Sequence, residues 1–300
     1  MNSQLLSRTM ANSPVILMAV LFMLLASPAS AQPLEVIEVA PGVHMLRVPA
    51  LISGNIGVAS GADRTMIIDT SFAALTPLIR NAIAGFAQKP VSIVLNTHYH
   101  GDHTGGNANF AQTGAVIYAH DNTRLRLEGA PVDQRERETD ASLPMITFDN
   151  TMSLYVNGEH IYVFHVANAH TDGDVIVHFQ NANVFQMGDI FFNFRYPYID
   201  TDAGGTIEGI IAAVDQVLAI ADDETLIIPG HGPLSDRATL VAYREMLETV
   251  RERVSIAIDE GRTLAQILSL RPTAEFDVQC GGGDVTAGDF VSMVYRSMMR

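Results

Sequence analysis

The densest group of reactive side chains lies at residues 96–103, where the chain reads Asn-Thr-His-Tyr-His-Gly-Asp-His. Three imidazoles and one carboxylate fall close together there, from His98, His100, Asp102 and His103. Neutral imidazoles and carboxylates are a ligand set that suits zinc. A lone His-x-His pair is usually an ordinary surface feature, but four ligand-type side chains directly after an apolar strand indicate a metal site.

The spacing within this segment predicts two ligand directions. His98 and His100 are two residues apart, so in extended backbone their side chains point the same way. We expect Gly101 to allow a sharp turn. The Asp-His pair at residues 102–103 would then face a second point a few ångströms away. A helix is expected to begin near residues 105–106.

Three further ligand-type side chains recur downstream, and each stands at a turn after an apolar strand. They are His170, Asp189 and His231. Any one of them alone is typical of a polar loop residue. Together they repeat one arrangement, in which the end of a strand delivers one ligand to a common rim.

The elements that position these residues alternate between short apolar runs and helical patterns. Three runs over residues 161–187 predict an antiparallel meander, and the order of all elements favours two packed sheets with helices outside. Strands are predicted at residues 43–48, 65–69, 91–95, 115–119, 161–166, 175–179, 184–187 and 225–228, and helices at 72–86, 207–219, 235–260, 263–270 and 290–299.

The pattern of ligand-type residues resembles that of the metallo-β-lactamase superfamily. The His-x-His-x-Asp-His motif is matched at residues 98–103, and the later His, Asp and His at 170, 189 and 231. The resemblance implies an α/β fold, an αββα sandwich of two mixed β-sheets with helices on the outer faces. It also implies two zinc ions per chain, with iron or manganese as the alternative metals.

The same resemblance assigns the ligands. One ion would be held by His98, His100 and His170, and the other by Asp102, His103 and His231, with Asp189 bridging the two. Asp69 matches an acid beneath the motif loop. Such an acid is physically sensible, because ligating imidazoles need their outer nitrogen held.

One departure from the family pattern concerns the substrate. Zinc β-lactamases of the commonest subclass carry Cys at the position of Asp189 and, three residues later, a Lys that binds the drug carboxylate; here that later residue is Phe192. Asp189 is similar to the glyoxalase II and lactonase branches. Arg195 is a candidate substitute cation. Phe192 and Tyr196 belong to an aromatic stretch that either walls a substrate cleft or packs as core.

The function expected from these residues is that of a zinc-dependent hydrolase. A metal-bridging hydroxide would attack the carbonyl of a small ester, thioester, lactone or β-lactam, with Asp102 as the catalytic proton shuttle. The alternatives are a class B β-lactamase proper, a mononuclear iron oxygenase on the same fold, and a non-catalytic periplasmic zinc-binding protein.

The composition of the chain limits which classes of molecule it is expected to bind. The formal net charge is −15, which opposes phosphate backbones and argues against nucleic acid, so a small-molecule substrate is expected. Hydrophobic residues make up 48% of the chain, enough for a sizeable core. The single cysteine, Cys280, excludes an internal disulfide, and its role stays open, as does the oligomeric state.

The first 31 residues read as a signal peptide. Arg8 precedes an apolar run at residues 15–26, which is shorter than the roughly 20 residues that span a bilayer. Ala29-Ser30-Ala31 then offers a cleavage pattern. We expect an exported, periplasmic or secreted protein without stable membrane insertion, the alternative being an uncleaved anchor. Residues 32–300 would form a single domain with a helical C-terminal tail from about residue 262.

Overall fold

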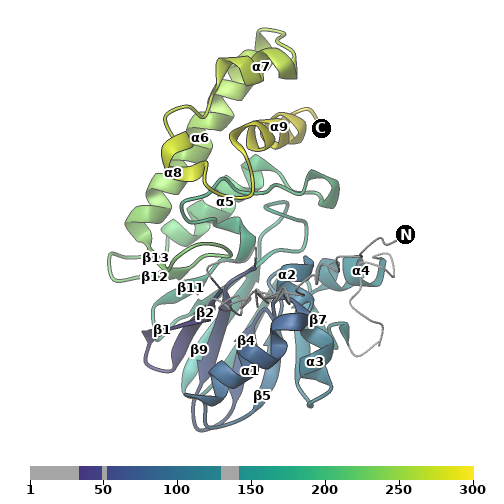
Figure 1. Cartoon of the computed structure of the whole chain (residues 1–300), viewed down its shortest axis with the longest axis vertical. Coiled ribbons are helices and arrows are strands. Elements are labelled where there is room, and N and C mark those ends of the chain that lie inside the picture. The colour runs from purple at the N-terminus through teal and green to yellow at the C-terminus, as the bar shows by residue number, and fades with distance from the viewer. Residues whose placement is uncertain (1–33, 49–52, 130–141) are drawn as a thin grey trace, which may run out of the picture. The chain divides into compact units, whose positions relative to one another are not determined.

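The computed structural model describes residues 34–48, 53–129 and 142–300 (Figure 1). The predicted signal peptide, residues 1–31, lies outside these described residues. From residue 34 onward the described chain belongs to one compact unit. Within these ranges, no helix combines the length and the apolar character needed to cross a bilayer.

The described residues form two mixed sheets. The seven-stranded sheet has its strands in chain order and is antiparallel from β1 to β4 and parallel from β4 to β7. Its strands are β1 Glu35–Ala40, β2 Val43–Arg47, β3 Ile56–Ser60, β4 Thr65–Ile68, β5 Val91–Leu95, β6 Val116–His120 and β7 Ile146–Phe148.

The six-stranded sheet has the order β13-β12-β11-β10-β9-β8, and only its β11–β12 pair is parallel among the described strands. The antiparallel pairs β9–β10 and β10–β11 confirm the predicted meander. Its strands are β8 Thr151–Val156, β9 Glu159–His165, β10 Val175–Phe179, β11 Val184–Gln186, β12 Leu226–Ile228 and β13 Ser235–Asp236.

Alternation along β4 shows how the layers arise. Met66 and Ile68 join the core between the two sheets, whereas Ile67 between them joins the core beneath α1 (Thr76–Ala84) and α3 (Asn107–Ala111). The outer face of the second sheet packs on α5 (Ile207–Leu218), α6 (Arg237–Asp259) and α9 (Ala287–Met298). The predicted sandwich with helices on both outer faces is therefore confirmed.

One predicted helix start is wrong for a local reason. The helix expected from residue 235 begins at Arg237, because Ser235 and Asp236 pair with β12 and the Asp236 side chain caps the helix by accepting from the Thr239 N–H at 2.8 Å. The helix expected near residues 105–106 is α3, whose N-cap is Gly106, and the short helix α2 (Gly101–Thr104) precedes it. Gly101 is thus the first residue of a short helix, where the backbone leaves the extended conformation of His100.

Several short elements complete the described chain. The tail beyond α6 contains α7 (Leu264–Leu270) and α8 (Asp277–Cys280) before α9. Cys280 ends α8 as a buried thiol, and burial raises its pKa to about 11. The remaining elements are η1 Ala73–Leu75, α4 Asp121–Gly129, η3 Gly188–Ile190 and η4 Thr201–Ala203.

Candidate metal centre

The ligand-type residues singled out from the sequence come from both sheets. Four follow β5 of the first sheet, two in the loop after the strand and two in α2. The other three belong to the second sheet, where His170 follows β9, Asp189 lies in η3 after β11, and His231 follows β12. The ends of four strands, from two sheets, thus deliver side chains to one place.

The first group consists of His98, His100, His170 and Asp189, whose candidate ligand atoms lie within 4.8 Å of one another. His100 Nδ1 lies 3.1 Å from His98 Nε2 and 2.9 Å from His170 Nε2. Asp189 Oδ2 lies 3.8 Å and 3.7 Å from those two Nε2 atoms. Three ring nitrogens and one carboxylate oxygen therefore face a common point.

In His170 and His100, the ring nitrogen that faces away from the group contacts an oxygen atom. This contact determines that the other ring nitrogen has the lone pair that can bind a metal ion. His170 Nδ1 lies 2.8 Å from the carbonyl oxygen of Tyr198, which only accepts, so Nδ1 carries the proton and Nε2 keeps a lone pair. His100 Nε2 lies 3.0 Å from Asp200 Oδ2, which leaves Nδ1 with the lone pair. Burial lowers the pKa of His170 to about 4, so its ring is neutral at pH 7.

The second group consists of Asp102, His103, Asp189 and His231, again within 4.8 Å. Asp102 Oδ2 lies 3.3 Å from the Nε2 atoms of both His103 and His231. Asp189 Oδ1 lies 3.1 Å from His103 Nε2 and 3.3 Å from His231 Nε2. Asp189 thus directs one carboxylate oxygen to each group.

The sequence-predicted Asp69 lies beneath His103. Its Oδ2 is 2.8 Å from His103 Nδ1, and the Thr97 N–H and hydroxyl each donate to its carboxylate at 2.7 Å. Asp69 is fully buried, and burial raises the pKa of its carboxyl despite the neighbouring imidazole. The contact keeps the proton of His103 on Nδ1 and leaves Nε2 facing Asp189.

These two groups fit a pair of metal ions. His103 Nε2 and Asp189 Oδ1 are buried, and neither has a hydrogen-bond partner in the described chain. A buried polar atom without a partner is costly, and a metal ion would satisfy both atoms at once. Burial alone would raise the pKa of Asp189, but His231 and His103 hold it well below its usual value, so the carboxylate is charged.

Close backbone packing places Asp189 and His231 together. Gly230 N–H donates to the carbonyls of Gly188 and Phe191 at 2.8 and 3.0 Å. A Cβ on Gly230 would collide with Asp189 Oδ1, so only glycine permits this approach. His231 pairs with Phe192 in an isolated parallel bridge, which fixes the loop after β12 beside η3.

A cleft of about 480 Å³ opens over the two groups. All three residues predicted to meet the substrate line it: Phe192, Arg195 and Tyr196. Phe192 stacks on His231 with ring centroids 4.9 Å apart. Tyr196 is almost fully buried, and its hydroxyl donates to Asp277 Oδ1 at 2.8 Å. Its ring therefore forms part of the cleft wall, and its hydroxyl is already hydrogen-bonded. The aromatic stretch therefore serves both as core and as cleft wall.

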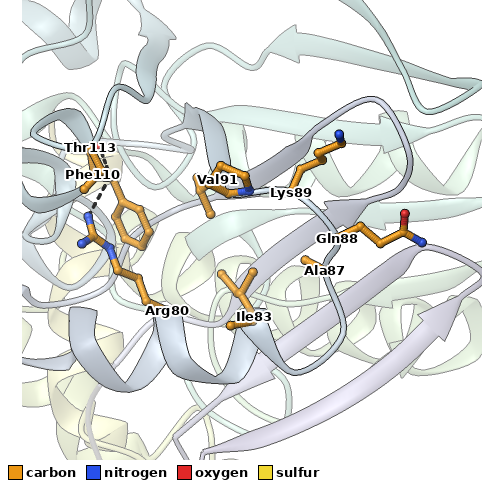
Figure 2. A pocket seen from close by; sticks show the side chains of 10 residues that line it. Arg80, Ile83, Ala87, Gln88, Lys89, Val91, Phe110 and Thr113 are labelled. Carbon is orange, nitrogen blue, oxygen red and sulfur yellow. Dashed lines mark hydrogen bonds between the residues drawn. The ribbon is translucent and has the colours of Figure 1, made fainter.

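A second cavity, of about 380 Å³, has a different character. It is lined by the end of α1 and by α3, with Ile83 and Phe110 among the lining residues and Arg80 bonded to Thr113 (Figure 2). Lys89 extends along its edge (Figure 2). Neither histidine nor a carboxylate lines it, so it offers no metal ligands.

Asp200 is a site residue that the sequence did not suggest. Its Oδ2 accepts from the Tyr99 hydroxyl at 2.5 Å and contacts His100 Nε2. Tyr99 is half-buried, and the Arg126 guanidinium lies over its ring, 5.6 Å from the ring centroid. No sequence signal links Asp200 to a motif one hundred residues away, because only the fold makes them neighbours.

Comparison with known proteins places these observations in a family context. A model described as "Metallo-beta-lactamase superfamily" matches residues 50–231, which include both groups of ligand-type residues. A hydroxyacylglutathione hydrolase from Polaromonas sp. (strain JS666 / ATCC BAA-500) is 30% identical over 159 residues. That match covers 52% of this chain and 54% of the relative, so the chain spans about half the length of the curated relative.

Solved structures share the fold at low sequence identity. A metallo-beta-lactamase from Pontibacter korlensis has a TM-score of 0.62 and 18% identity, covering 72% of this chain and 99% of its own. The DIM-1 metallo-beta-lactamase has a TM-score of 0.60 and 22% identity, covering 72% of this chain and 98% of its own. These likenesses concern the arrangement of helices and strands.

Proposed function

Because this chain belongs to the metallo-β-lactamase superfamily, we propose that it is a dinuclear zinc hydrolase acting on a small ester or thioester. The observation that carries the proposal is the shared position of Asp189, which turns one oxygen to each of two groups of ligand atoms. Two ions held there would supply an acidified water and a polarised carbonyl. Zinc is favoured because imidazole and carboxylate are its usual partners in hydrolytic sites.

Asp102 is proposed as the catalytic carboxylate. Its side chain is 18% exposed and lines the cleft, whereas the other carboxylate of the pair, Asp189, is only 5% exposed. Asp102 can therefore reach a substrate, accept the proton of the attacking water and pass it to the leaving oxygen or sulfur. Phe192 and Tyr198 line the cleft beside Asp102.

The choice of ester or thioester over β-lactam rests on two residues. Asp189 stands where the commonest zinc β-lactamases have cysteine, and Phe192 stands where they have a lysine. The curated relative is named for a thioester hydrolysis, which supports the same choice. β-Lactams and lactones therefore belong in the test panel as the second class of substrate.

A metal analysis combined with a substrate panel tests the proposal. We expect two zinc ions per purified chain, and hydrolysis of an ester or thioester that a chelator abolishes and zinc restores. One iron per chain would overturn it in favour of an oxygenase. Two zinc ions without turnover of any ester, thioester, lactone or β-lactam would favour the non-catalytic zinc-binding alternative.

Export is part of the same proposal, supported by the composition of residues 1–31. N-terminal sequencing of the protein produced in a bacterial host with an intact export pathway tests it. A mature chain that begins at Gln32 in the periplasmic or secreted fraction is the expected result. A chain that retains Met1 in the cytoplasm would contradict it.

A further inference from the structure

We propose that an anionic group of the substrate binds Arg195 by displacing Asp284, so that the C-terminal segment of residues 281–285 sets the charge selectivity of the cleft. This inference rests on the proposed hydrolase function. It concerns a part of the chain beyond residue 231, where the match to the family model ends.

Arg195 is the only arginine or lysine that lines the cleft among the described residues. The cleft is bordered on the same side by Asp284 and Val285 of the C-terminal segment. Arg195 Nη1 donates to Asp284 Oδ2 at 3.2 Å. The C-terminal segment thus presents a carboxylate to the one guanidinium that a substrate in the cleft can meet.

The Arg195–Asp284 pair has the geometry of an exchangeable contact. It is the single hydrogen bond of Arg195 in the described chain, and the two side chains are 26% and 50% exposed. Arg126 and Asp172 differ, since two parallel contacts of 2.6 Å join them. A single contact in water is weak, so a substrate carboxylate that displaces Asp284 can replace it with two parallel contacts to the guanidinium.

The aliphatic part of the Arg195 side chain packs on the backbone of the C-terminal segment, and three glycines directly precede Asp284. A Cβ on Gly283 would lie 3.1–3.2 Å from the Cβ, Cγ and Cδ of Arg195, so the segment packs flat against the aliphatic part of that side chain. The neighbouring Tyr196 is fixed by its bond to Asp277 and by stacking on Phe290 at 5.2 Å. Three successive glycines, 281–283, give the backbone that carries Asp284 freedom to move aside.

Charge explains why an anion would make this exchange. The chain carries a formal net charge of −15, so an anionic substrate gains little from the surface elsewhere. At Arg195 it finds a planar donor fork suited to a carboxylate. The carboxylate of Asp284 occupies that fork in the free protein and competes with the substrate for it.

Two esters that differ only in charge test the inference: mono-4-nitrophenyl succinate and 4-nitrophenyl pentanoate. The readout is the ratio of the KM for the anionic ester to the KM for the neutral one. Asp284→Asn should lower this ratio about three- to fivefold, because the competing charge is lost. Arg195→Gln should raise it about tenfold. In the Arg195→Gln background, Asp284→Asn should have no further effect.

Glu275→Gln is the matched control, since it also removes one negative charge and one exposed ion pair, with Arg253 at 2.8 Å, from the tail. It should leave the ratio unchanged. The inference is overturned if Asp284→Asn leaves the ratio unchanged, or lowers it equally with and without Arg195. If the parent chain hydrolyses neither these esters nor any thioester, the proposed function itself has failed.

Discussion

His100 and Asp200 are joined across one hundred residues of sequence by a 3.0 Å contact between Nε2 and Oδ2. Asp200 thereby orients the ring so that Nδ1 faces the first group of ligand atoms. Asp200→Asn keeps an oxygen that can accept from the Ala203 N–H but removes the charge behind His100. We expect zinc affinity to fall about 10- to 100-fold, measured by competition with a chromophoric chelator.

Asp202→Asn is the control for that experiment, because Asp202 is fully exposed and contacts only Arg300, at 3.4 Å, in the described chain. Its zinc affinity should match that of the parent chain. Equal affinities for the Asp200 and Asp202 variants would show that the contact to His100 does not influence the metal.

Single substitutions should separate the two metal positions. His98→Ala removes a ligand of the first group and His231→Ala one of the second, so each should reduce zinc from two ions per chain toward one and abolish hydrolysis. Asp189→Asn affects both groups and should lower the content further. Elemental analysis after gel filtration gives the stoichiometry.

His160→Ala serves as the reference, since His160 belongs to neither group. Full activity and two zinc ions per chain in the His98 or His231 variant would refute the assignment of that residue as a ligand.

A single methyl group at Gly230 should disrupt the metal centre. The added Cβ of Gly230→Ala would collide with Asp189 Oδ1 and stand 2.5 Å from the backbone of Gly188. We expect a loss of about 1–3 kcal/mol of stability and weakened zinc binding. Gly129→Ala, where no atom of the described residues lies within 4 Å of the new Cβ, should neither destabilise the protein nor weaken zinc binding. Denaturant unfolding with and without zinc measures both, and parent-like behaviour of Gly230→Ala would contradict the close approach.

His178 predicts a stability effect of pH that is separate from the metal. It is buried and stacked on Phe185 at 3.9 Å, and burial lowers its pKa to about 4. The unfolded chain binds this proton near pH 6.5. The contribution of the neutral His178 ring to stability is therefore complete above pH 6.5. The free energy of unfolding falls as the pH drops from 6.5 toward 4, because the unfolded chain binds the proton first.

Replacing His178 with Gln should flatten this part of the curve relative to the parent chain. Urea unfolding at half-unit intervals of pH gives the free energy of unfolding of both proteins. Loss of zinc in acid affects both proteins alike, so the difference between the two curves reports His178. The slope attributable to one such group is at most about 1.4 kcal/mol per pH unit. Parallel curves for the two proteins would disprove the prediction.

Sequence patterns located the strands that are rich in Val, Ile and Leu. β5 and β10 have the predicted bounds because both are largely buried. β1 and β8 were not predicted, because polar residues such as Glu38 and Ser153 interrupt their apolar runs, and most of their residues are exposed or only partly buried. α4 was missed for a similar reason, since Thr123 is the only fully buried residue in it.

The residues of the metal site also divide into those that the sequence identified and those that it did not. The ligand-type residues could be found because each stands directly after an apolar strand. The role of Gly230 depends on a backbone approach to Gly188, and that of Asp200 on the contact with His100. Both roles depend on which strands become neighbours in the fold. A short stretch of sequence does not show which strands these are.

The distribution of the two groups between the sheets has a consequence for folding. The motif after β5 comes from the first sheet, whereas His170, Asp189 and His231 come from the second. Neither sheet alone can complete either group, so tight zinc binding requires both sheets to be formed and docked. The free energy of zinc binding is therefore coupled to the assembly of the sandwich. The unfolding midpoint should rise with the free zinc concentration, and zinc availability in the compartment then becomes a determinant of how much folded protein persists.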